Sequence, residues 1–152
     1  MIEVVIDTLN IFNNYGSIIP LCEENDLASI NRSPLAMGLL SGKFNEASVL
    51  PKEDVRGAGH AWADHLFKDG KPNKELLRAL DAIRSILTSN GRTVAQGALA
   101  WIWARSKVTI PIPGFKAMKQ MEENVKAMDF SPLSETQIRE IDNILNGIIQ
   151  QE

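Results

Sequence analysis

Two segments of the chain combine an apolar run, a turn rich in glycine or proline, and a lysine. Residues 29–43 read SINRSPLAMGLLSGK, and residues 110–116 read IPIPGFK. A helical pattern that carries Gln120, Glu123 and Asn124 follows the second segment at once. Free backbone N–H groups at the start of a helix, with a cation nearby, form an arrangement that holds phosphate. Both segments therefore predict phosphate-binding junctions between a strand and a helix.

The first junction could also be a structural turn or a nucleotide P-loop. Considered alone, residues 33–43 fit a purely structural turn as well as a phosphate contact. Gly38 and Lys43 suggest a nucleotide P-loop, but their spacing is one residue short, and Phe44 stands where that motif needs a Ser or Thr for Mg²⁺. We therefore reject the P-loop.

Other residue types that could do chemistry are sparse. His60 and His65 are five residues apart, a spacing that does not place two imidazoles on one helical face for zinc. We expect both on the surface and no metal site. We expect Tyr15 to be a packing or cap residue. Cys22 is the single cysteine, and we expect it to be a small buried apolar residue in a helix.

The elements that must position the junctions follow from hydrophobic periodicity. Short β-branched runs predict buried parallel strands at residues 3–7, 27–31 and 108–112. Helices are expected over residues 17–24, 73–89 and 93–105, after residue 116, and from residue 134. The long polar segment 44–72 predicts an insertion or lid. This alternation predicts an α/β fold with a parallel sheet, and it leaves open whether the sheet closes into a barrel.

Composition sets limits on class and location. The chain has 152 residues, 44% of them hydrophobic and 23% charged, with a net charge of −3. These values are ordinary for a globular protein, and no basic stripe predicts nucleic-acid binding. No segment predicts a membrane span or an export signal, so we expect a cytoplasmic protein. A complete eight-stranded barrel needs roughly 200 to 250 residues, which exceeds this length.

Together the two junctions resemble, in the right order, the nucleotide-binding end of the aldo-keto reductases. Residues 93–101, TVAQGALAW, and residues 132–134, PLS, also resemble that family. The resemblance covers nearly the whole chain. It implies a single truncated domain over residues 1–152, a partial TIM-type (β/α) barrel of about three parallel βα units with extra helices. The Asp, Tyr, Lys and His that carry the family's chemistry belong to earlier strands, so the resemblance implies no catalytic residue here.

The resemblance also implies a set of cofactor-binding residues. Arg32 takes the place of an aromatic residue that many members stack on the nicotinamide, and a guanidinium plane can stack in the same way. The resemblance assigns the pyrophosphate to Ser33, Leu35, Gly38 and Lys43. It assigns the adenosine 2′-phosphate and the adenine to Gly114, Phe115, Lys116, Gln120, Glu123 and Asn124.

Three positions depart from the family pattern. Other branches have Lys in place of Gly114 and Arg in place of Gln120, so two charge contacts to a 2′-phosphate are missing. Lys116 could restore one of them, which favours NADP(H) and leaves NAD(H) as the alternative. The family often has Gln four residues before Asn10 to bind the carboxamide, and this chain has Ile6.

Two functional hypotheses follow. In the first, the chain is the NADP(H)-binding C-terminal part of an oxidoreductase that reduces aldehydes or ketones, and it is inactive alone. In the second, it is a non-catalytic oligomeric scaffold that has lost cofactor binding and reductase activity. Three strands leave unpaired edges, which predicts a dimer, a tetramer, or a partner chain that supplies the missing strands.

Overall fold

The structure, a computed structural model, describes residues 4–13 and 18–149. In chain order the helices and strands are β1 (Val4–Thr8), α1 (Ile18–Glu24), β2 (Ala28–Arg32), β3 (Phe67–Lys68), β4 (Lys71–Pro72), α2 (Lys74–Leu87), α3 (Val94–Arg105), β5 (Thr109–Pro111), α4 (Met118–Lys126) and α5 (Glu135–Ile149). Short 3₁₀ turns are η1 (Ala36–Ser41), η2 (Ala61–Ala63), η3 (Ser89–Gly91) and η4 (Ala127–Asp129). All three predicted strands and the five predicted helices are present.

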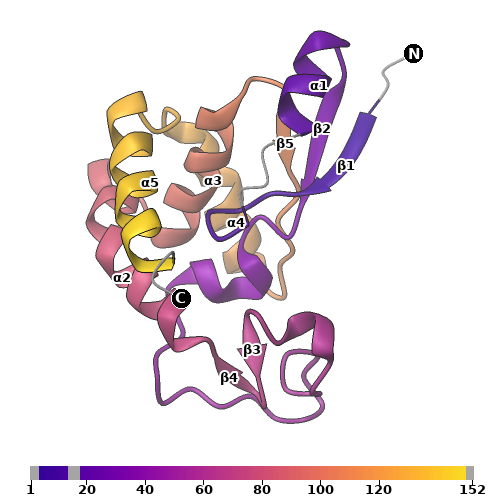
Figure 1. The fold of residues 1–152 in the computed structure, drawn as a ribbon, viewed down its shortest axis with the longest axis vertical. Helices are drawn as coiled ribbons and strands as arrows, with labels where there is room; N and C mark the ends of the chain where they lie inside the picture. Colours follow the sequence, from indigo (N-terminus) through magenta and orange to yellow (C-terminus); the bar gives the residue numbers. More distant parts are fainter. Residues whose placement is uncertain (1–3, 14–17, 150–152) are drawn as a thin grey trace.

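The main sheet is parallel, with strand order β1-β2-β5 (Figure 1). Ile6 pairs with Ile30, and Ile30 pairs with Ile110, so these three side chains share one face. That face is open: Ile6 is 65% exposed and Ile110 is 47% exposed. Parallel sheets are usually covered on both faces. The open face is therefore an apolar surface that the described part of this chain leaves uncovered.

Helices α2, α3 and α5 pack against one another beside the sheet, as Figure 1 shows. A capping box starts α3, because Thr93 and Gln96 exchange hydrogen bonds between side chain and backbone, as predicted. Leu80, Ile83 and Ile141 are fully buried between the helices. Cys22 is also buried, on α1, which confirms its predicted packing role. No helix among residues 4–13 and 18–149 is long and apolar enough to cross a membrane.

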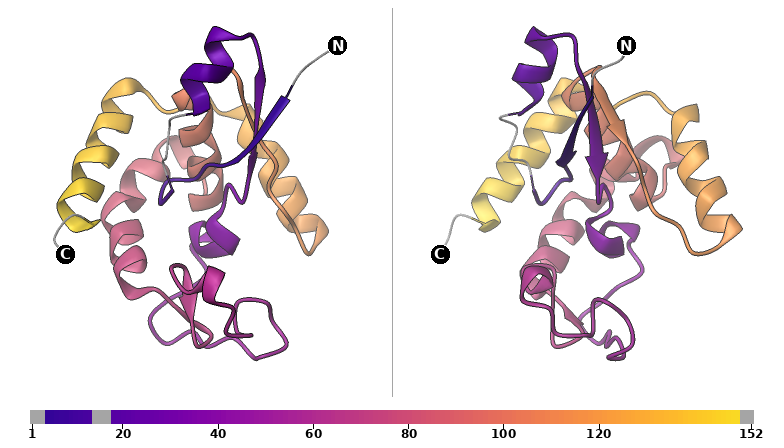
Figure 2. Two further views of the ribbon diagram at one scale, coloured as in Figure 1. Left: turned by 45° about the vertical axis from the view of Figure 1, so that its right-hand side comes forward. Right: turned by 90° about the vertical axis from the view of Figure 1, so that its right-hand side faces the viewer.

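The segment 44–72 lies at the end of the sheet toward which β1 and β2 point (Figures 1 and 2). It is more ordered than a polar loop, because it contains η2 and the antiparallel pair β3–β4, with Phe67 buried. Its backbone is tightly packed: a Cβ at Gly57 would lie 2.1 Å from the Pro51 carbonyl oxygen. We call residues 44–72 the insertion.

Candidate functional site

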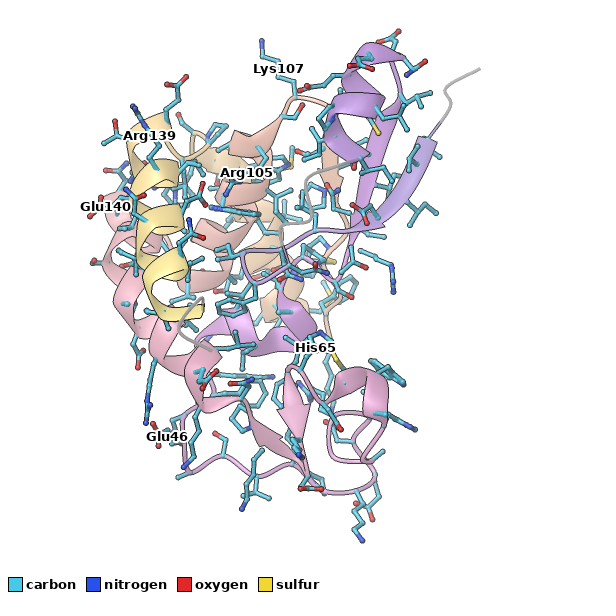
Figure 3. All side chains as sticks on the ribbon, viewed as in Figure 1. Glu46, His65, Arg105, Lys107, Arg139 and Glu140 are labelled. Carbon is cyan, nitrogen blue, oxygen red and sulfur yellow. The ribbon has the colours of Figure 1, made fainter. Side chains whose placement is uncertain are left out.

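A pocket of about 540 Å³ lies where β1 and β2 end. Thr8, Arg32 and Ser33 line it from the sheet, and Trp62 and His65 line it from the insertion. Figure 3 shows His65 where the insertion meets the rest of the chain. Ligands of α/β proteins bind at the carboxyl ends of parallel strands. The predicted residues Arg32 and Ser33 are therefore at the expected end of the sheet.

Asn10 fixes the relative position of the two strand ends. It is 3% exposed; its Nδ2 donates to the Ser33 carbonyl oxygen at 3.2 Å, and its Oδ1 accepts from the Phe12 N–H at 3.0 Å. Ser33 itself has φ of +53°. Asn10 is a site residue that no local pattern in the sequence predicts, because this bond joins residues far apart in the chain.

The turn after β2 differs from the turn and helix start that the sequence predicts. Ala36, Met37 and Gly38 have φ of +46°, +54° and +90°. The Leu35 carbonyl oxygen accepts from the N–H groups of Gly38, at 2.8 Å, and Leu40, at 3.2 Å. These amides are thus used inside the turn, and a phosphate would be held by side-chain cations beside it. The left-handed residues cost about 1–2 kcal/mol each outside glycine, so other contacts must hold the turn.

Arg56 of the insertion supplies such a contact. Its Nη1 donates to the Met37 carbonyl oxygen at 3.1 Å, while its Nε and Nη2 donate to the Asp54 carboxylate at 2.7 and 2.6 Å. The guanidinium also lies 5.4 Å from the centroid of the Phe44 ring. We call the Asp54–Arg56–Met37 arrangement the clamp. It joins the insertion to the turn, and the sequence analysis missed it.

The clamp shifts the pKa values of its own two charged groups in opposite directions. The pKa of Asp54 is held well below its ordinary range, first by the side-chain hydrogen bond from Arg56 and then by the Arg56 backbone N–H, and the charge of Lys116 lowers it further. The same side-chain bond raises the pKa of Arg56. Lys116, which precedes α4, has the smallest of these effects on Asp54.

Gly38 and Lys43 border the clamp. A Cβ at Gly38 would lie 3.4 Å from Arg56 Nη1 and 4.0 Å from Lys43 Cε. The Lys43 ammonium lies 4.9 Å from the Phe44 ring centroid. Lys43 also edges a separate cleft of about 400 Å³ against α2. Lys43 and Arg56 therefore both lie beside the turn, next to Gly38 and Phe44, whereas Lys116 belongs to the second junction.

The entrance of α4 corrects one expectation. The Gln120 Oε1 accepts from the backbone N–H groups of Lys116, at 2.7 Å, and Ala117, at 3.2 Å. These two amides are occupied by a side-chain cap, although the sequence analysis expected free N–H groups here. Only the side-chain NH2 group of Gln120 remains available to a ligand. Gln120 is the N3 residue of α4, and a side chain at N3 easily reaches back to the backbone N–H groups at the start of its own helix. Its oxygen therefore caps the helix and does not face a nucleotide.

The remaining predicted residues lie along this second junction. Gly114 and Phe115 are exposed, and a Cβ at Gly114 would meet no atom within 4 Å. Glu123 and Asn124 are half-buried on α4. The Gln96 Nε2 donates to the Glu123 carbonyl oxygen at 3.0 Å, which attaches α4 to α3. Leu35 is half-buried in the turn.

The histidines and Tyr15 have separate outcomes. His60 and His65 are both exposed, as predicted. Within residues 4–13 and 18–149, no group of His, Cys, Asp or Glu side chains could hold a metal ion. Tyr15 lies outside the described residues. The chemistry of the described site is therefore that of cations, amides and aromatic rings.

The Aldo/keto reductase family model matches residues 4–146. The chain belongs to the aldo/keto reductase family. An NADP(+) aldo-keto reductase, yakc, of Schizosaccharomyces pombe is 30% identical over 124 residues, which are 82% of this chain and 34% of that relative. A probable voltage-gated potassium channel subunit beta of Arabidopsis thaliana is 30% identical over 115 residues, 76% of this chain and 34% of the relative.

The fold agrees with solved members of the family. The glycerol dehydrogenase of Gluconobacter oxydans aligns with a TM-score of 0.79 at 21% identity, over 98% of this chain and 44% of that structure. The α/β class and the parallel three-stranded sheet expected from the sequence are thereby confirmed. This aldo/keto reductase chain spans about a third of the length of these curated relatives.

Proposed function

We propose that this aldo/keto reductase chain binds NADP(H) around the clamp and the adjoining pocket, as the cofactor-binding part of an oxidoreductase that reduces aldehydes or ketones. The observation that carries the proposal is the strained turn after β2, which Arg56 holds and beside which Lys43 lies. Lys43 follows that turn, and the Arg56 Nη1 donates to the Met37 carbonyl oxygen within it. The pyrophosphate and the 2′-phosphate of NADP(H) are negatively charged, and lysine and arginine side chains bind such groups.

The predicted residues divide along the dinucleotide. Arg32 would contact the nicotinamide ring from the pocket, and Ser33, Leu35, Gly38 and Lys43 would border the pyrophosphate. The adenosine end would be assigned to Gly114, Phe115, Lys116, Gln120, Glu123 and Asn124. The bound cofactor supplies hydride to a carbonyl carbon. NAD(H) is the alternative ligand, because Gly114 and Gln120 carry no charge for a 2′-phosphate.

We also propose that the three strands form part of a (β/α) barrel that a second copy, or a chain with the missing strands, completes. β1 and β5 are the outer strands of the described sheet, and its isoleucine face is open. The catalytic segments of the family have no counterpart here, so the chain alone is inactive. A reducing, cytoplasmic location suits the unpaired, buried thiol of Cys22.

The second candidate function is a non-catalytic oligomeric scaffold. Ile6 stands where the family often has a Gln that binds the nicotinamide carboxamide. The side-chain oxygen of Gln120 caps α4 and is not free for a ligand. One relative at 30% identity is named a probable channel subunit. The two departures favour a chain that keeps the fold of the family with less need for cofactor, and the relative's name favours a role in an assembly.

Calorimetric titration separates the two functions. We expect NADPH to bind the chain at micromolar concentration, and NADH to bind more weakly. Arg56→Ala should weaken NADPH binding about tenfold, because the variant releases the Met37 carbonyl and with it the turn that places Gly38 and Lys43. Arg139→Ala is the matched control, since its exposed side chain bonds to the Glu135 carbonyl oxygen on α5, away from the insertion (Figure 3). Absence of binding for both nucleotides would overturn the proposal and favour the scaffold.

A further inference from the structure

The turn that joins α2 to α3 holds an Asn-Gly pair that takes no part in the site described above (Figure 1). Asn90 has φ of +60° and ψ of +24°, and Gly91 has φ of +80°. The Arg92 N–H donates to the Ser89 carbonyl oxygen at 3.4 Å. Positive φ at both central residues, with this bond across them, defines a type I′ turn, for which Asn-Gly is a preferred pair.

The two central residues of this turn are open to solvent, and its ends are anchored. Asn90 and Gly91 are exposed, and a Cβ at Gly91 would meet no atom within 4 Å. The buried Arg92 donates from Nη1 to the Ser89 carbonyl oxygen at 3.0 Å and from Nη2 to the Ser131 carbonyl oxygen at 2.8 Å. The peptide plane between Asn90 and Gly91 can therefore rotate between fixed ends, since glycine accepts φ of either sign.

This rotation brings the Asn90 side chain into line with the Gly91 nitrogen. It converts a type I′ turn into a type II′ turn, in which ψ of the first central residue is about −120°. At that ψ the Gly91 nitrogen eclipses Cβ of Asn90 about the Cα–C bond, which is the geometry of a five-membered ring closed through Cγ. At the observed ψ of +24° the nitrogen is turned away from Cγ. The reaction that closes the ring therefore waits for the peptide plane to rotate.

We propose that Asn90 is a site of self-modification, at which the backbone nitrogen of Gly91 attacks Cγ of Asn90. The Gly91 nitrogen gives its proton to hydroxide, the N–Cγ bond forms, and the side-chain nitrogen takes a proton from water and leaves as ammonia. Water then opens the cyclic imide at either carbonyl, which leaves aspartate or isoaspartate at position 90. The net reaction consumes water and releases ammonia, and it needs no oxidant, cofactor or partner.

The chain contains one other Asn-Gly pair, Asn146 and Gly147, which serves as an internal comparison. This pair lies within α5, where ψ is about −42° and the helical hydrogen bonds oppose rotation of a single peptide plane. A Cβ at Gly147 also meets no atom within 4 Å. Crowding at the glycine therefore does not distinguish the two pairs, whereas the backbone conformation does.

The two products at position 90 differ in their effect on the turn. Aspartate keeps the length of the backbone and adds only a charge. Isoaspartate places an extra methylene in the backbone between Ser89 and Arg92, whose bond to Ser131 ties the turn to the segment before α5. We therefore expect the isoaspartate form to unfold at a lower urea concentration than either the aspartate form or the unmodified chain.

The test follows both Asn-Gly peptides by mass spectrometry while the folded chain is incubated at mildly alkaline pH. The Asn90 peptide should convert to aspartate and isoaspartate at least about tenfold faster than the Asn146 peptide. In the urea-denatured chain the two peptides should convert at similar rates, because only the local sequence then acts. Asn90→Gly is the matched variant, since glycine keeps the positive φ without the reacting side chain. Its folded form should release ammonia much more slowly than wild type.

Three results would overturn the proposal. The first is an Asn90 peptide that stays unmodified in the folded chain while it converts in urea. The second is a folded chain in which Asn146 converts as fast as Asn90. The third is a product that contains aspartate and no isoaspartate, because direct hydrolysis of the side-chain amide gives aspartate alone and involves no attack by Gly91.

Discussion

Arg56→Ala should destabilise the fold by about 2–3 kcal/mol in the free energy of unfolding. The variant removes two charge-assisted bonds to Asp54 and one to the Met37 carbonyl. Such bonds contribute about 1.5–3 kcal/mol each when buried. The Arg56 and Asp54 side chains are 18% and 24% exposed, so the contribution of each bond lies at the lower end of that range. The three contributions do not add, because the bonds share one guanidinium group.

Urea unfolding at pH 7 measures this loss. Arg78→Ala removes an ion pair whose side chains are 69% and 52% exposed, and it should change stability by less than about 0.5 kcal/mol. A double-mutant cycle with Asp54→Asn should give a coupling energy of about 1–2 kcal/mol. Stability of Arg56→Ala equal to that of wild type would refute the clamp.

The pH dependence has a defined sign. Arg56 holds the folded-state pKa of Asp54 well below its ordinary value, and the unfolded value is about 3.9. The clamp's contribution is therefore fully present above about pH 4 and is lost as the pH falls toward the lowered folded pKa. Stability curves of wild type and Asp54→Asn should run parallel from about pH 5 to 8 and converge at lower pH. A gap that widens on acidification would contradict this reasoning.

Four other outcomes are expected. Lys116→Ala should weaken NADPH binding at least tenfold and NADH binding much less, since one charge-assisted contact to the 2′-phosphate contributes about 1.5–3 kcal/mol; equal losses in titrations would remove Lys116 from that site. Gly114→Lys should raise the affinity for NADPH relative to that for NADH, because the added ammonium can pair with the 2′-phosphate and a Cβ at this position meets no atom within 4 Å. An unchanged ratio of the two affinities would contradict this expectation. The isolated chain should not oxidise NADPH with simple aldehydes, and steady substrate-dependent turnover would reveal an acid that we have not identified. Light scattering after size exclusion should show a dimer or tetramer that Ile110→Asp dissociates, whereas a folded wild-type monomer would oppose self-association.

The sequence predicted the elements well because their signals are local. The capping box of Thr93 and Gln96 spans only three residues, and the strands are short β-branched runs. The clamp was not predictable in this way, since Arg56 meets a carbonyl 19 residues away. The Asn10 bond to Ser33 spans 23 residues. Such bonds depend on the packing of the insertion, for which a sequence offers no periodic pattern.

Gln120 shows a different reason for a missed contact. Its position three residues after Ala117 suits a helix cap as well as a ligand contact. Nothing in the spacing decides between the two uses, and in the structure the cap takes the side-chain oxygen. A local motif can therefore predict the right residue at the right place and still leave its chemical role undecided.

The site and the open sheet face are built from different contacts. The strained turn at Ala36 and Met37 is held by Arg56 of the insertion, so the shape of the site depends on the insertion. The open face depends on residues such as Ile110, which make none of these bonds. The bonds that shape the site come from within this chain, whereas the open face is a surface for association. Changes at Arg56 should therefore alter nucleotide affinity, and changes at Ile110 should alter assembly.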